Sequence, residues 1–170
     1  DIEYITISST GNAIAFGQCT GGTQGANGAS SETRAIVHAS GSVPGGSANN
    51  TIEYVTISSL GDAQNFGDLP IQVQGADSLS NAIRAVITSG SEGTAPAYGM
   101  TNVLSYVNIA TTGDTKNFGD LTSVRNASAS GMLSTAINGY FAGGQTPSRI
   151  TDINNVKRTI ETFSRRLQLE

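Results

Sequence analysis

The stretch "IEYVTISSLGDA", residues 52–63, determines the fold because the chain contains three versions of it. The others are "IEYITISSTGNA" at 2–13 and "LSYVNIATTGDT" at 104–115. Side chains alternate along the first half of each version, with the period of two that places successive residues on opposite faces of a strand. Each version therefore predicts a strand, and the repetition predicts one supersecondary unit used several times.

A glycine follows each of these strands at the same place, as Gly11, Gly61 and Gly113. Glycine readily adopts the positive φ of a tight turn, so we expect the chain to fold back there as a hairpin. A second short apolar run follows, as "TRAIVHASG", "IRAVITSG" and "NGYFAGG", and ends at glycine or small residues. Each period therefore holds about four short antiparallel strands, and no helical periodicity occurs before the last twenty or so residues.

A phenylalanine followed by glycine comes after each turn, at Phe16, Phe66 and Phe118. The strands carry a tyrosine at the same intervals of 50 and 52 residues: Tyr4, Tyr54 and Tyr106. We interpret the three phenylalanines as equivalent core side chains, each the large apolar anchor of its unit. The tyrosines are expected to pack in the core or between sheets.

These motifs resemble kelch repeats, and most closely the kelch-like arrays in structural proteins of tailed bacteriophages, especially marine cyanophages. In those arrays "EYVTI", "TGDA", "NFGDL" and "GG" recur in this order, as they do over about residues 2–149 here. In the best copy, Phe118 stands where kelch usually has Trp, Arg125 is the later arginine, and Gly143 and Gly144 form the double glycine. The first unit departs with "AFGQC", and the first two units lack a double glycine.

We therefore expect an all-β fold in which residues 1–150 form one domain of three kelch-like antiparallel repeats, at about 2–50, 51–101 and 102–150. A β-propeller usually has four to eight blades, and this chain supplies about three. Three solutions stay open: subunits combine into one larger ring, the chain is a piece of a longer array, or three sheets close around a pseudo-threefold axis as in a β-prism or β-trefoil. The first residue is Asp1 rather than Met, so the true start is open as well.

The tail, residues 151–170, has a different pattern. Apolar residues recur there at alternating intervals of three and four, which slightly favours an amphipathic helix that Asp152 would cap. The alternative is a closing strand of the third unit, because "TIE" at 159–161 matches "TIE" at 51–53. We interpret the tail as a candidate docking segment, with an apolar stripe and two basic residues for an acidic rim: Ile153, Val156, Ile160, Phe163, Arg165, Arg166 and Leu167.

Composition argues against several classes of function. The net charge is −4 and only 13% of the 170 residues are charged, which does not suit a nucleic-acid surface. No apolar run reaches the roughly 18 residues of a membrane span. Cys19 and His38 are the only residues of their kinds, and neither a GxSxG motif nor a DxDxDG loop is present. We expect no enzyme, no cofactor, no metal site, and no nucleic acid or membrane as partner.

The resemblance implies a non-enzymatic virion structural protein, and we expect a decoration or knob protein on the capsid exterior. Its partner would be the major capsid protein or another virion protein, and a homo-oligomer is compatible with the repeats. The alternative is a receptor- or glycan-binding module of a tail fibre or appendage, with host surface glycan as the ligand. Tyr98 and Tyr140 lie outside the tyrosine register and are the candidate glycan contacts, since the chain has no Trp.

Overall fold

The structure is a computed structural model that describes residues 1–21, 26–38, 48–88, 90–92, 99–145 and 153–157. These residues form strands joined by turns, and no helix occurs among them, so the predicted all-β class is confirmed. Within the same ranges there is accordingly no helix long and apolar enough to cross a membrane.

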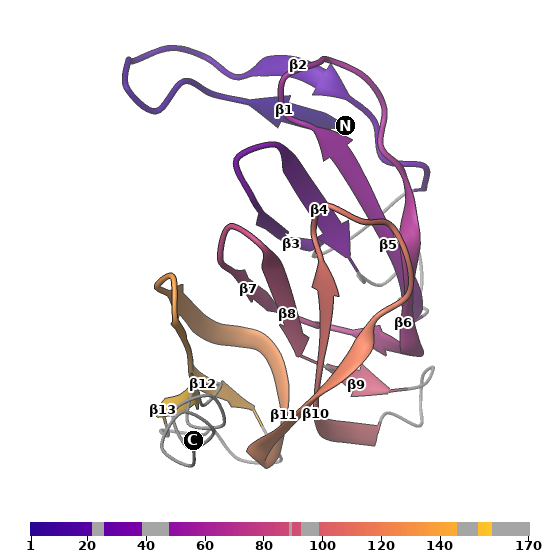
Figure 1. Cartoon of the computed structure of the whole chain (residues 1–170), viewed down its shortest axis with the longest axis vertical. Coiled ribbons are helices and arrows are strands. Elements are labelled where there is room, and N and C mark those ends of the chain that lie inside the picture. Colours follow the sequence, from indigo (N-terminus) through magenta and orange to yellow (C-terminus); the bar gives the residue numbers. More distant parts are fainter. Residues whose placement is uncertain (22–25, 39–47, 89, 93–98, 146–152, 158–170) are drawn as a thin grey trace, which may run out of the picture.

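Four antiparallel sheets follow one another along the molecule, and none of them is closed (Figure 1). The first sheet contains β1 (Ile2–Tyr4) and β2 (Ile14–Gly17). The second contains, in order, β3 (Asn27–Ser30), β4 (Arg34–His38), β5 (Asn49–Thr56) and β6 (Gln64–Gln74). The third contains β7 (Ser78–Ser80), β8 (Arg84–Thr88), β10 (Gly99–Asn108) and the first part of β11 (Lys116–Ser134). The fourth contains the second part of β11, β12 (Asn138–Gln145) and β13 (Ile153–Lys157), and the short β9 (Ser91–Glu92) links β6 to β10.

Each four-stranded sheet combines strands from two consecutive periods of the sequence. In the second sheet β4 pairs with β5, and Ala35 lies opposite Val55. In the third sheet β8 pairs with β10 in the same register, with Ala85 opposite Val107. The sheets are therefore offset from the sequence repeats by half a period. The first two strands of each period belong to one sheet, and the last two belong to the next.

The first part of the tail occupies an equivalent position in the fourth sheet. β13 pairs with β12 with Val156 opposite Gly139, the register in which β5 and β10 meet β4 and β8. The slightly favoured helix is therefore wrong for Ile153–Lys157, and the alternative of a closing strand is found there. Five residues beside an open strand edge form hydrogen bonds with that edge regardless of a helical spacing of their apolar side chains. The remainder of the predicted helix, 158–170, lies outside the described residues.

The three tyrosine–phenylalanine pairs recur with the same geometry. Tyr4 meets Phe16 edge to face with 6.2 Å between ring centroids, and the two later pairs are both at 6.0 Å. Burial differs, because Phe66 is only 2% exposed in the main core cluster whereas Phe16 and Phe118 are half-buried. The predicted equivalence of the phenylalanines is thus correct for position and wrong for the degree of burial.

Arg125 is fully buried and joins the first part of β11 to β12. Its guanidinium donates to the carbonyl oxygen of Gly143 at 2.7 Å and to the hydroxyl of Ser123 at 3.1 Å. Gly143 and Gly144 have φ angles of 75° and 107°, which favour glycine. The late arginine and the double glycine of the kelch-like copy therefore meet in space, and the two hydrogen bonds offset part of the cost of burying the charge.

A loop of one sheet binds a strand of the preceding sheet, and this contact occurs twice. The N–H groups of Gly61 and Ala63 donate to the carbonyl oxygens of Phe16 and Gln18, at 3.0 and 2.8 Å. The N–H of Gln18 donates in return to the carboxylate of Asp62 at 2.9 Å. We call this arrangement the loop-on-strand contact.

The second loop-on-strand contact reproduces the first about fifty residues further on. Gly113 and Thr115 donate to the carbonyl oxygens of Phe66 and Asp68, at 2.7 and 3.0 Å, and the N–H of Asp68 donates to Asp114 at 3.0 Å. Among the turn glycines, Gly61 and Gly113 have positive φ angles of 155° and 148°. Gly11 does not, so the predicted turn conformation is correct in the two loops that bind a strand and wrong in the first.

Candidate functional site

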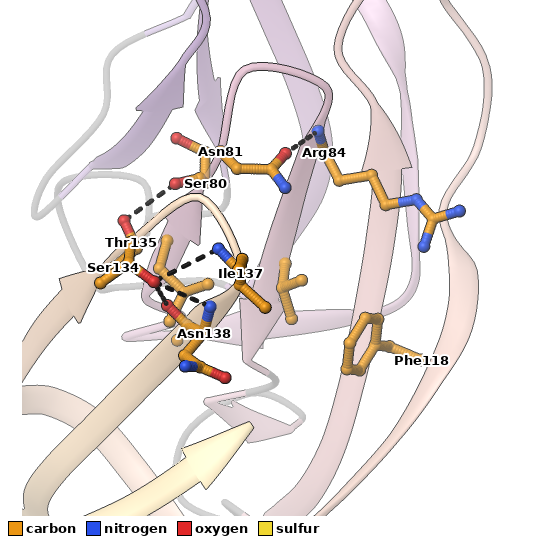
Figure 2. Close-up of a pocket in the computed structure, with 11 residues that line it drawn as sticks. Ser80, Asn81, Arg84, Phe118, Ser134, Thr135, Ile137 and Asn138 are labelled. Atoms are coloured by element: carbon orange, nitrogen blue, oxygen red, sulfur yellow. Dashed lines mark hydrogen bonds between the residues drawn. The ribbon is translucent and has the colours of Figure 1, made fainter. Parts of the chain in front are cut away.

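A small cleft lies between the turn that joins β7 to β8 and the turn that joins β11 to β12 (Figure 2). Apolar side chains form one wall, namely those of Leu79, Val86, Phe118 and Ile137. Polar side chains form the other: Ser80, Asn81, Arg84, Ser134, Thr135 and Asn138. The lining of this cleft comes from two consecutive sequence periods.

In each turn at this end of the sheets, the side chain of the first turn residue accepts hydrogen bonds from backbone N–H groups of the same turn. The Asn81 amide oxygen accepts from the N–H groups of Ile83 and Arg84, at 2.9 and 2.8 Å. The hydroxyl of Thr135 accepts in the same way from Ile137 and Asn138, at 3.2 and 3.0 Å. Asparagine and threonine favour such turns because their short polar side chains replace a backbone hydrogen-bond partner.

The turn before β4 is built on the same plan with a serine. The Ser31 hydroxyl accepts from the N–H groups of Thr33 and Arg34, at 3.3 and 3.2 Å. A Ser, Asn or Thr three residues before the strand is thus the local signal for these turns, and our sequence analysis missed it. The polar groups at the turns stabilise the turns themselves.

The three turns are also hydrogen-bonded to one another. The Ser80 hydroxyl donates to the carbonyl oxygen of Ser30 at 2.9 Å, and the Ser134 hydroxyl donates to the carbonyl oxygen of Ser80 at 2.8 Å. The Asn81 amide donates to the carbonyl oxygen of Ala136 at 3.1 Å. The turns therefore form one continuous ladder across three sheets, which fixes the spacing of consecutive units.

Arg84 enters the cleft from β8 and stacks on an aromatic ring. Its guanidinium carbon lies 4.9 Å from the ring centroid of Tyr106. Arg34, at the corresponding place in β4, lies 4.5 Å from the ring of Tyr54 and also donates to the carbonyl oxygens of Ile109 and Ala110 at 3.3 and 3.0 Å. A cation over an aromatic face is stabilised by the ring quadrupole, so each pair fastens one strand to the next.

The volume of the cleft limits what it can hold. It encloses about 90 Å³, whereas pockets for small-molecule ligands usually measure roughly 300–1,000 Å³. Gly139 lies against the side chain of Leu79, and a Cβ there would lie 2.6 Å from a methyl carbon of that leucine, which would have to move. The cleft thus has room for water or a single polar group and not for a substrate of ordinary size.

A shallower depression crosses the tips of all three turns. It has a volume of about 370 Å³ and is open to solvent. Its lining is almost entirely small and polar, with one carboxylate: Ser30, Ser31, Glu32, Ser80, Asn81, Ala82, Ser134, Thr135 and Ala136. Hydroxyl and amide groups in an open groove suit polyhydroxylated ligands better than apolar ones.

His38, the only histidine, is buried at the end of β4. Burial lowers its pKa to about 4, so the ring is neutral at physiological pH. Neither ring nitrogen forms a hydrogen bond in the structure. The strand neighbours of His38 are Asn27 and Ile52, so nothing opposite it in the sheet can form a catalytic triad. His38 is therefore a packed, buried side chain.

Cys19 lies near Glu53, in an environment that disfavours its thiolate form. Burial, the nearby Glu53 charge and a hydrogen bond to that carboxylate raise the pKa of the thiol. Glu53 also accepts from both the N–H and the hydroxyl of Thr20. A raised pKa reduces the thiolate fraction that nucleophilic chemistry needs. Among the described residues, no group of three or more His, Cys, Asp and Glu side chains is arranged to hold a metal ion.

The residues singled out from the sequence do not converge on one site. Tyr140 is half-buried in β12, opposite Leu133 and Asn155, whereas Tyr98 lies outside the described residues. Ile153 and Val156 belong to β13. The other proposed docking residues lie outside the described part of the chain: Ile160, Phe163, Arg165, Arg166 and Leu167.

Comparison with known proteins gave no match, either to any protein family or to any curated protein.

Proposed function

We propose that the chain is a non-enzymatic virion structural protein that decorates the capsid exterior of a tailed bacteriophage. The resemblance of its motifs to phage kelch-like arrays provides the starting point. The structural observation that carries the proposal is how the polar side chains at the turns are used. Asn81 and Thr135 cap their own turns, and Asn81 and Ser134 also bond to the neighbouring turn.

This use of polar groups suits a stiff surface element. Catalytic sites bring titratable groups together with perturbed pKa values in a cleft. Here His38, whose pKa is strongly lowered, is sealed inside a sheet, and the cleft is lined by groups already engaged in the turns. The ladder of turns presents a regular polar face, which is what an exposed decoration protein requires.

Attachment to the particle is assigned to the end of the tail. Because Ile153 and Val156 lie in the strand β13, the proposed docking residues narrow to Ile160, Phe163, Leu167 and the pair Arg165 and Arg166. Apolar burial would supply affinity to the major capsid protein or another virion protein, and the two charges would supply register and encounter rate.

A second candidate is a glycan-binding module of a tail fibre. The open depression of about 370 Å³ over the turn tips favours it, because hydroxyl and amide groups there face solvent. Half-buried Tyr140 lies on β12, which starts at the third of these turns.

A reconstruction of purified virions, together with mass spectrometry of their proteins, tests both candidates. Density of this chain on head capsomeres is the expected result. Density at the tail tip would favour the glycan-binding module, and the absence of the chain from virions would overturn both. A glycan array probed with the purified chain is the matching solution experiment, and the capsid proposal expects no binding there.

A further inference from the structure

The first sheet is half of a four-stranded sheet. β1 pairs with β2 on one side, and its other edge has no partner strand among the described residues. In the second and third sheets the strands equivalent to β1 are covered on this edge by β4 and β8. The consequence is visible in burial: Ile5 is 61% exposed, whereas the corresponding Val55 and Val107 are 7% and 3% exposed.

The fourth sheet supplies the missing half. β12 corresponds to β4 and β8 and is the last of these inner strands among the described residues, and its outer edge is occupied by β13. Where β5 and β10 present Tyr54 and Tyr106 to stack on a phenylalanine, β13 has Asn155. β13 therefore has the register of the other strands without their aromatic anchor.

The loop-on-strand contact needs a loop and a strand. Among the described residues, one such strand has no loop bound to it and one such loop has no strand bound to it. A Cβ on Gly17 or Gly67 would lie 2.1 or 2.3 Å from the carbonyl oxygen of the bound loop. Around the corresponding Gly119, no described atom lies within 4 Å of that position. Asp120 beyond it is exposed and lies opposite Val103, just as Asp68 lies opposite Thr51.

Among the described residues, the loop with no strand bound to it is the first one. Gly11, Asn12 and Ala13 are exposed, and a Cβ on Gly11 would meet nothing within 4 Å. They correspond to Gly61, Asp62 and Ala63, which bind the first strand.

We propose that two copies of this chain join head to tail in a closed ring, in which β1 of each copy replaces β13 on β12 of the other. The loop Gly11–Ala13 of one copy then binds the strand at Gly119 and Asp120 of the other. The contact repeats one already present twice inside the chain, so it needs no new type of interaction. This inference goes beyond the proposed function and does not depend on it.

Charge and strand count both support a second copy of this chain as the partner of the free edge of β1. Asn12 is neutral where Asp62 and Asp114 are acidic, so it can accept from the N–H of Asp120 without repulsion between two carboxylates. Each chain has two complete four-stranded sheets, and the exchange creates one more per chain. Two chains then contain six such sheets, within the four to eight that close a propeller.

The first test is the mass of the full chain in solution, measured by sedimentation velocity over a concentration series. We expect a species of twice the 17.4 kDa of the chain. Ile5→Asp, which places a charge on the edge that becomes buried, should weaken association at least tenfold. Thr10→Asp is the matched control, because the corresponding Leu60 and Thr112 stay exposed in the covered sheets, and it should change association less than twofold.

The second test fixes the register. Inside the chain, His38 lies opposite Ile52 and Thr88 lies opposite Leu104. Ala142 corresponds to His38 and Thr88, and Ile2 corresponds to Ile52 and Leu104. Ile2 of one copy should therefore lie opposite Ala142 of the other. In a Cys19→Ser background, the pair Ile2→Cys and Ala142→Cys should form a disulfide-linked dimer, because paired antiparallel residues have Cα distances that suit a disulfide. The pair Ile2→Cys and Tyr140→Cys, two residues out of register, is the control and should crosslink at least tenfold less.

A wild-type chain that stays monomeric up to millimolar concentration would overturn the proposal. So would a dimer that Ile5→Asp leaves intact, or equal crosslinking by both cysteine pairs. A disordered Ile5→Asp variant, detected by circular dichroism, would leave the wild-type mass and the cysteine pairs to decide. A solution monomer found on capsids would refute only this inference, and a dimer absent from virions would refute only the proposed function.

Discussion

Gly67 lies directly beneath the carbonyl oxygen of Gly113, so that a Cβ at Gly67 would approach that oxygen to 2.3 Å. The glycine of each "FG" pair is thus needed where a loop of the next sheet crosses the strand. Gly119 has a similar φ, 141° against 154°, and open space around it. A side chain at Gly119 would therefore meet backbone strain alone, whereas a side chain at Gly67 would meet both backbone strain and steric overlap.

Gly67→Ala should therefore destabilise the chain more than Gly119→Ala. Both substitutions incur the cost of an alanine at positive φ, roughly 1–3 kcal/mol. Only Gly67→Ala adds overlap with a backbone atom, which typically costs a further 1–3 kcal/mol or so. Urea unfolding of both variants at low concentration, where association is negligible, measures the difference. Equal free energies of unfolding would contradict the loop-on-strand contact.

Phe66→Ala should cost about 3–5 kcal/mol of unfolding free energy, because the ring is fully buried in the main core cluster. Phe16→Ala should cost much less, since the half-buried Phe16 belongs to the open first sheet. Thermal unfolding of the two variants at low concentration, where the proposed dimer is dissociated and the first sheet is open, is the measurement. A loss at Phe16 as large as at Phe66 would contradict the difference in burial between the two rings.

The strands and the way they pair show what the sequence could and could not predict. Alternation around Tyr54 and the glycine after it predicted strand and turn, because both are local preferences. The pairing of β4 with β5 crosses the boundary between repeats, and the periodicity within a strand does not encode which strands pair. For Ile153 and Val156 the open edge of β12 decided the structure, and a spacing of three residues could not reveal that edge.

The candidate site was less predictable than the fold. The place of His38 at the end of an apolar run was compatible with either a packed or a surface side chain, and only the packing of the sheets decided for burial. The turn-capping roles of Ser31, Asn81 and Thr135 had a local signal, a short polar residue three positions before each inner strand. The ladder among the turns had none, because it depends on how three sheets stack.

His38 should make the chain sensitive to mild acid. Its pKa is about 4 in the folded state against 6.5 for an ordinary histidine, so the unfolded chain binds the proton first as the pH falls. Stability is thus intact above pH 6.5 and declines between 6.5 and 4, by about 3 kcal/mol in all. Urea unfolding at pH 7.0, 5.5 and 4.5 should show the decline, and His38→Leu should remove most of it above pH 5, where few carboxylates titrate. An unchanged slope in the variant would contradict the buried neutral ring.

Arg34→Lys should destabilise the chain more than Arg84→Lys. Both arginines stack on a tyrosine, but Arg34 also donates to the carbonyl oxygens of Ile109 and Ala110, and a lysine cannot keep the planar stack and both bonds. We expect about 1–2 kcal/mol for Arg34→Lys, the net value of hydrogen bonds from a charged group, and less than about 1 kcal/mol for Arg84→Lys. If urea unfolding gave equal losses of unfolding free energy for Arg34→Lys and Arg84→Lys, the two carbonyl contacts of Arg34 would contribute nothing to stability.

Truncation of the tail separates its strand from the proposed docking segment. Removing residues 158–170 leaves β13 in place, so the free energy of unfolding should change little while incorporation into particles is lost. Removing residues 151–170 also strips β13 from β12 and should destabilise the fourth sheet of an isolated chain. The same truncation frees the edge that β1 of a second copy is proposed to take, so the shorter chain should associate more strongly than the full one. Circular dichroism, sedimentation and a particle-binding assay on both truncations measure the three effects, and particle binding by the chain lacking 158–170 would contradict the docking role.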